Sequence, residues 1–66
     1  MNAEKLIAEY TQKYQSLDAE IEKLSANRAI ARKEMNEAWY MDLTIEIKQK
    51  QAQRQCYFQF TIDLQA

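Results

Sequence analysis

A heptad stripe runs through the first half of this chain, and the 66 residues contain no glycine or proline to interrupt it. Apolar and small residues recur at alternating spacings of four and three, which keeps them on one face of a helix. Asn2 is a plausible N-cap, and Glu4 places an acid in the first turn, where the helix dipole favours negative charge. The pattern predicts one long helix over residues 2–38. The stripe consists of Ala3, Ile7, Tyr10, Tyr14, Leu17, Ile21, Leu24, Arg28, Ala31, Met35 and Ala38.

The two halves of this stripe differ in the size of their side chains. The N-terminal half is bulky, whereas the C-terminal half is rich in alanine and carries Arg28. Small residues let a neighbouring element approach closely, so the helix is expected to serve two different neighbours. A break with a second helix beginning near Ser16 or Asp18 is the alternative to one continuous helix.

The second half of the chain changes period. Residues 41–48 and 57–64 alternate apolar and polar side chains, which is the period of a β-strand, and they are rich in strand-forming residue types. In an antiparallel pairing with Ile45 opposite Phe60, every apolar residue lies on one face. The sequence therefore predicts an α+β fold in a single domain of residues 1–66, in which the helix is followed by an antiparallel β-hairpin.

The segment between these two stretches favours a different fold. Neither Ala52 nor Gln53 suits the positive φ of a two-residue hairpin turn, and residues 48–55, KQKQAQRQ, are good helix formers. An all-α helical hairpin is therefore the alternative, although the apolar residues of this half fit a helical face poorly.

Self-association is expected from the small size of the chain. A core of this size contributes only about 3–5 kcal/mol, and Cys56 is the only cysteine, so no internal disulfide can form. A strand of eight residues covers only about half of the predicted helix, which leaves the bulky half of the stripe for a second chain. We expect a homodimer or a higher homo-oligomer. Its predicted surface is Ile7, Tyr10, Tyr14, Leu17, Ile21 and Leu24.

Catalytic groups are scarce in this sequence. The chain has no histidine, and no cysteine spacing typical of a zinc site. Cys56 alternates with Phe58 and Phe60 and is predicted to be a buried structural thiol. Asp18 and Glu22 are interpreted as a solvated face because no third metal ligand accompanies them. We therefore expect a non-enzymatic protein without metal or cofactor.

Basic and aromatic residues are the candidates for binding a partner. Without a partner, the arginines would form salt bridges, the basic residues of the predicted hairpin tip would keep the turn solvated, and the aromatic residues would pack the junction of helix and strand. Their functional role is a partner-binding surface, since Trp, Tyr and Arg dominate interface hot spots. The candidates are Arg28 and Arg32 on the helix, Trp39 and Tyr40 at the predicted junction, and Lys48, Lys50 and Arg54 at the predicted hairpin tip.

The net charge of −1 argues against a dedicated non-specific nucleic-acid binder. No apolar run is long enough to cross a membrane, and no signal peptide opens the chain, so a cytoplasmic location is expected. The predicted function is non-catalytic protein–protein interaction. In its general type the chain looks like the small accessory inhibitors that phages and mobile elements encode against host machinery such as defence systems. Binding of nucleic acid or a phosphorylated small ligand through the basic clusters is one alternative, and a structural oligomerisation module is another.

Overall fold

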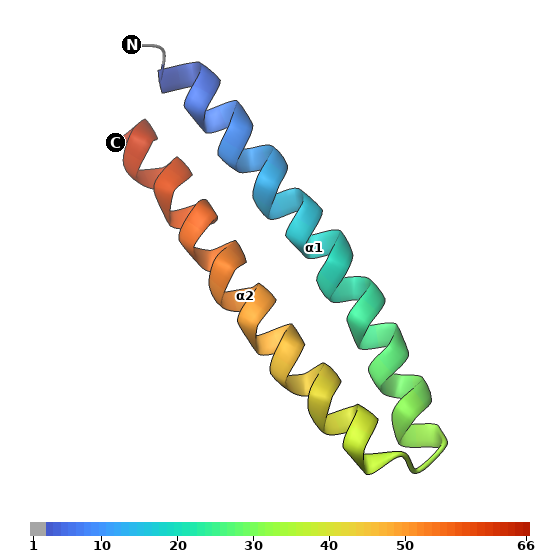
Figure 1. Cartoon of the computed structure of the whole chain (residues 1–66). Coiled ribbons are helices and arrows are strands. Elements are labelled where there is room, and N and C mark those ends of the chain that lie inside the picture. The colour runs from blue at the N-terminus through green and yellow to red at the C-terminus, as the bar shows by residue number, and fades with distance from the viewer. Residues whose placement is uncertain (1–2) are drawn as a thin grey trace.

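The protein is a helical hairpin. In a computed structural model, helix α1 (Ala3–Lys33) runs antiparallel to helix α2 (Glu37–Gln65), and a short loop joins them (Figure 1). The structure describes residues 3–66, which form a rod with extents of 51 × 14 × 13 Å. The last turn of α2 lies beside the beginning of α1, and the loop occupies the opposite end. We call these two ends the open end and the loop end.

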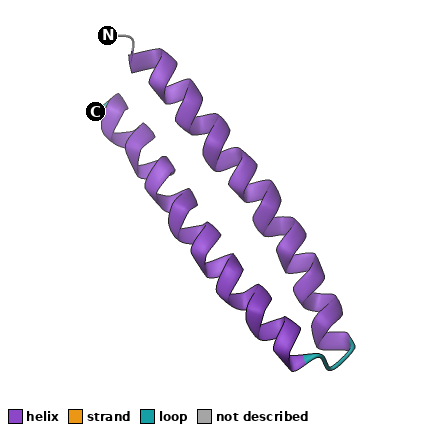
Figure 2. Cartoon of the chain, viewed as in Figure 1, coloured by secondary structure: helices purple, strands orange, loops and turns teal. Residues whose placement is uncertain are grey.

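The α+β prediction is wrong, and the all-α hairpin describes the fold. Residues 41–48 and 57–64 both lie within α2, and no strand occurs in residues 3–66 (Figure 2). Ile45 and Phe60, predicted to be opposite each other, are separated by about 22 Å along one helix. The helix-forming residues 48–55 continue the helix between the two alternating stretches.

Alternation misled the prediction because two helical faces of α2 are apolar. Leu43 and Ile47, four residues apart, are packed against α1 with exposed fractions of 6% and 3%. Met41 and Ile45 lie on the outer side of the same turns and are 59% and 53% exposed. Four apolar residues at every second position therefore mark an inner and an outer face of one helix.

The predicted first helix is continuous through residues 16–18 but ends at Lys33 rather than at residue 38. Asn36 is the N-cap of α2, and its side-chain oxygen accepts a hydrogen bond from the Trp39 amide at 3.1 Å. The other predicted cap, Asn2, lies outside the described residues. Arg32 and Lys33 in the last turn of α1 and Glu37 in the first turn of α2 each suit the adjacent helix dipole.

The core is a narrow seam between the helices. The heptad stripe of α1 supplies the buried residues Leu17 and Ala31, and α2 supplies Leu43, Ile47 and Thr61. The Thr61 hydroxyl donates to the carbonyl oxygen of Phe58 at 2.6 Å, so its burial leaves no hydroxyl without a partner. Neither helix of the described chain combines the length and hydropathy needed to cross a bilayer.

Candidate interaction surface at the loop end

The loop reverses the chain through a Schellman motif. The Asn36 amide donates to the Ala31 carbonyl at 2.9 Å, and the Met35 amide donates to the Arg32 carbonyl at 3.1 Å. This motif requires a left-handed residue, a position usually filled by glycine, and Met35 fills it with φ of 59°. The Met35 side chain is 86% exposed, so it contributes little to the packing of the hairpin.

A surface hollow of about 490 Å³ lies beside Met35. The ring of Tyr40 forms part of its wall, and the Arg28 guanidinium lies over that ring, 5.8 Å from its centroid. Met41 adds a second exposed methionine to the same hollow. We call the residues that line it the loop-end surface: Ala31, Arg32, Met35, Asn36, Glu37, Tyr40 and Met41.

The structure brings part of the predicted binding set to this end. Arg32 and Tyr40 line the hollow, Arg28 packs on Tyr40, and Trp39 is half-buried in the first turn of α2. The predicted junction of helix and strand is thus the junction of two helices, where Tyr40 lies close to Arg28 and Arg32.

The remaining predicted residues lie elsewhere, because no hairpin tip exists at residues 48–54. Lys50 Nζ is 3.6 Å from a Glu20 carboxylate oxygen. The Arg54 guanidinium Nε donates to Asp18 Oδ1 at 2.9 Å. Both basic side chains therefore join α2 to α1, whereas Lys48 is exposed on α2.

Arg54 also packs between aromatic rings in the seam. Its guanidinium carbon is 5.1 Å from the centroid of Tyr14 and 5.0 Å from that of Phe58. These two rings meet edge to face, with centroids 5.5 Å apart. The side chains of Arg54 and Asp18 are 31% and 48% exposed, so this ion pair contributes little to stability beyond the ring contacts of Arg54.

Three of the six residues predicted for self-association, Tyr10, Tyr14 and Leu17, pack within their own chain, and Tyr14 contacts Phe58 of α2. Tyr10 contacts Tyr57 and Phe60 with ring centroids 5.9 and 5.6 Å apart, and Leu17 is buried. Part of the bulky half of the stripe is thus used within one chain, and self-association stays a prediction.

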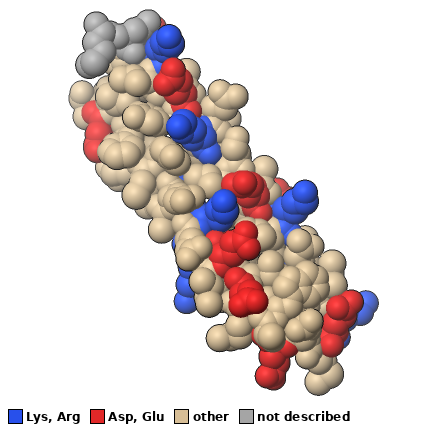
Figure 3. Space-filling model, in the orientation of Figure 1, with Lys and Arg blue, Asp and Glu red and all other residues tan. Residues whose placement is uncertain are grey.

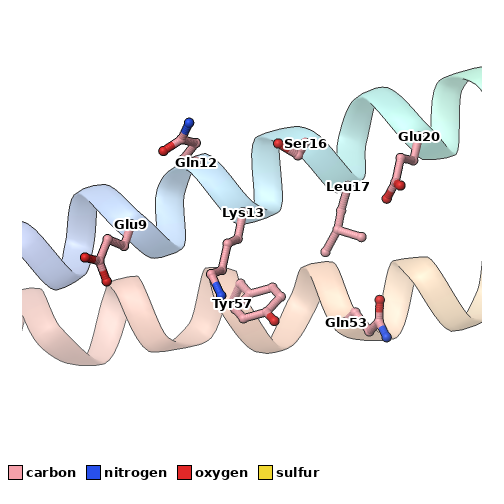
Figure 4. A pocket seen from close by; sticks show the side chains of 8 residues that line it. All are labelled: Glu9, Gln12, Lys13, Ser16, Leu17, Glu20, Gln53 and Tyr57. Carbon is pink, nitrogen blue, oxygen red and sulfur yellow. The ribbon is translucent and has the colours of Figure 1, made fainter.

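A second hollow, of about 460 Å³, lies on the side of the seam near residues 9–20 (Figure 4). Lys13 points across it and lies over the ring of Tyr57, 5.5 Å from the centroid. The other residues that line it are Glu9, Gln12, Ser16, Leu17 and Glu20 of α1 and Gln53 of α2. The hollow lacks a nucleophile paired with a base, so its geometry supports no particular reaction.

Cys56 corrects another sequence prediction. It was expected to be buried on the inner face of a hairpin, but it is free and exposed on α2. Within residues 3–66, no three side chains of the His, Cys, Asp and Glu types converge in a way that could hold a metal ion. Acidic and basic side chains are interspersed on the face shown in Figure 3, rather than gathered into one block of either sign.

Sequence reasoning missed Met35 and Met41 as exposed groups, because it placed Met35 in the helical stripe and Met41 in a strand. A signal for the loop was present: Asn36 followed by an acid, Glu37, is a typical helix start.

No family model matches the chain, and no curated protein or solved structure matches it either. The functional interpretation therefore rests on the geometry of the loop end and of the helix faces.

Proposed function

We propose that this chain is a non-catalytic protein–protein interaction protein that docks on another protein through the loop-end surface. The observation that carries the proposal is Met35. It occupies a left-handed conformation that costs a non-glycine residue about 1–2 kcal/mol, yet its side chain is 86% exposed. Folding alone favours glycine here, so the methionine is accounted for by a contact outside the chain.

The loop-end surface indicates the chemistry of its partner. Met35, Met41 and the ring of Tyr40 offer an adaptable apolar contact, since methionine side chains adjust to irregular surfaces. Arg32 and Glu37 at the edge of the hollow add charges of both signs. The matching surface on the partner is an apolar recess that accommodates Met35, with a carboxylate facing Arg32. This charge pair contributes more to the specificity of binding than to its affinity.

A chain without catalytic groups acts by occupying a surface. In this proposal, docking of the loop end excludes a competing ligand of the partner, which is the mode of action of an inhibitor. The phage-type inhibitor class is consistent with this mode and rests on the sequence interpretation alone.

Binding of nucleic acid or a phosphorylated ligand receives less support. Two of the three bases expected at a hairpin tip, Lys50 and Arg54, pair with Glu20 and Asp18. A phosphate would have to compete with these carboxylates, and acidic and basic side chains are interspersed on the face shown in Figure 3.

Comparative capture from a host extract tests the proposal. The baits are the wild-type chain, Arg32→Glu at the loop end, and Lys23→Glu, an exposed base on α1 away from the loop end. We expect a protein that the wild type and Lys23→Glu retain and that Arg32→Glu loses. A partner retained equally by all three baits would place the contact elsewhere and contradict the proposed surface.

A further inference from the structure

The isolated hairpin exposes more surface than a compact protein of its mass. The chain exposes 5205 Å² at a mass of 7.9 kDa, whereas a compact monomer of this mass exposes about 4,400 Å². The excess of about 800 Å² equals the area that one partner commonly contributes to a stable interface. A rod with a narrow seam can remove this excess by pairing with a second copy.

The exposed apolar residues indicate which helix pairs. Among the described residues, α1 exposes one large apolar side chain, Ile30, whereas α2 exposes Met41, Ile45, Phe60 and Ile62. Three of these four belong to a second heptad stripe, on the side of α2 away from the seam. We call it the outer stripe of α2: Met41, Ile45, Lys48, Ala52, Gln55, Gln59 and Ile62.

The outer stripe has the composition of a contact surface. Its residues are spaced alternately by four and three, which aligns them along one side of a helix. It contains no acid and one base, Lys48, although the chain as a whole carries 10 acidic and 9 basic residues. Ala52 lies at its centre, where a small side chain lets a second backbone approach.

We infer that α2 pairs with α2 of a second copy through the outer stripe, antiparallel and about a two-fold axis at Ala52. When two copies of one helix pair antiparallel, the residue numbers of facing residues add up to a constant. With a sum near 104, each residue of the outer stripe faces another residue of the outer stripe. Met41 then lies opposite Ile62 of the second copy, and Ile45 opposite Gln59. Lys48 lies opposite the uncharged Gln55, so no like charges meet.

This pairing goes beyond the proposed function because the outer stripe shares only Met41 with the loop-end surface. It leaves the two loop ends at opposite ends of the assembly, since the paired helices run in opposite directions. Each loop-end surface apart from Met41 therefore stays open for a target, and one dimer can engage two target sites. Met41 lies at the border between the two surfaces, so the tests use Ala52, which belongs to the outer stripe alone.

Substitution of the central alanine tests the inference directly. Ala52 is exposed in the hairpin, so Ala52→Glu keeps the helix but places two carboxylates side by side on the two-fold axis. The matched control is Ala26→Glu, the same change at an exposed position of α1. Light scattering coupled to size exclusion reports the mass, and circular dichroism confirms that both variants stay helical.

We expect a dimer of twice 7.9 kDa for the wild type and Ala26→Glu, and a monomer of 7.9 kDa for Ala52→Glu. The dissociation constant should rise about tenfold or more in Ala52→Glu. A wild type that is monomeric at its highest soluble concentration would overturn the inference, as would an Ala52→Glu variant that dimerises as the wild type does.

Disulfide capture provides a second test that does not depend on loss of mass. In a Cys56→Ser background, Ala52→Cys places one thiol of each copy at the axis, within reach of a disulfide. We expect mild oxidation to yield a covalent dimer with Ala52→Cys and not with Ala26→Cys. Equal cross-linking at both positions would exclude this axis. These readouts are independent of capture through Arg32, so either proposal can fail while the other holds.

Discussion

At the residue scale, Met35 shows how one side chain separates folding from function. The Schellman hydrogen bonds fix a left-handed backbone at this position, and a Cβ atom is unfavourable there. The side chain itself is almost fully in water. The left-handed backbone at Met35 is unfavourable for a residue with a Cβ atom, and its exposed side chain contributes little packing. Met35 can therefore be replaced without changing the contacts between the helices.

Replacing Met35 by glycine should therefore raise the stability of the hairpin. Relief of the left-handed conformation outweighs the added freedom of the unfolded chain, and we expect the free energy of unfolding to rise by about 1 kcal/mol. Thermal unfolding followed by circular dichroism should show a Tm about 4–8 °C higher. The control, Ala29→Gly in the interior of α1, should lower stability by about 1 kcal/mol. A destabilised Met35→Gly variant would show that this methionine serves the fold after all.

At the element scale, the chain shows what period alone can and cannot predict. The heptad stripe predicted α1 correctly over most of its length, because only a helix places residues spaced by four and three on one face. The same reasoning failed on α2, where Met41, Leu43, Ile45 and Ile47 belong alternately to an outer and an inner face. A helix with two apolar faces and a half-exposed strand have the same short-range pattern.

The interruption of the helix was also beyond what the stripe could predict. Met35 continues the heptad spacing, so the loop depends on the capping of α2 by Asn36, which is a local hydrogen bond. The candidate site followed the same division. Arg28, Arg32, Trp39 and Tyr40 were proposed from residue type. The hollow that groups Met35 and Met41 with Arg32 and Tyr40 could be seen only once the turn was known.

A pair of alanine substitutions distinguishes the two interpretations of residues 41–48. In a strand, Ile45 and Ile47 share one face and should cost similar amounts when truncated. In α2, Ile47 is 3% exposed and Ile45 is 53% exposed. We expect Ile47→Ala to cost about 2–4 kcal/mol and Ile45→Ala less than about 0.5 kcal/mol. Both are measured by denaturant unfolding at a protein concentration low enough to keep the chain monomeric. Equal losses would argue against the helical hairpin.

At the scale of the whole molecule, the rod shape determines how the chain can associate. One seam buries Leu17, Ala31, Leu43 and Ile47 as its apolar core, which is a small core for 66 residues. Pairing of a second copy along α2 adds burial over much of the length of the rod. Pairing through the loop ends instead joins two rods by their tips and buries little. The first mode therefore contributes far more to stability, and it makes Tm depend on protein concentration.

Small-angle X-ray scattering separates these two modes by shape. A single hairpin has a Cα radius of gyration of 15.1 Å and a longest extent of 51 Å. With helices packed about 10 Å apart, pairing along α2 doubles the mass but raises the radius of gyration only to about 16–18 Å. The longest dimension stays close to that of one rod, because the axis at Ala52 lies near the middle of α2.

Association through the loop ends predicts a different curve. Two rods joined by their tips reach nearly twice the length of one, and their radius of gyration approaches about 29 Å for the same helix geometry. We expect the wild type at high concentration to give the short, thick particle, and Ala52→Glu to return the scattering of one hairpin. A long particle from the wild type would move the self-contact to Met35 and its neighbours, and the loop-end surface would then be occupied by a second copy instead of a target.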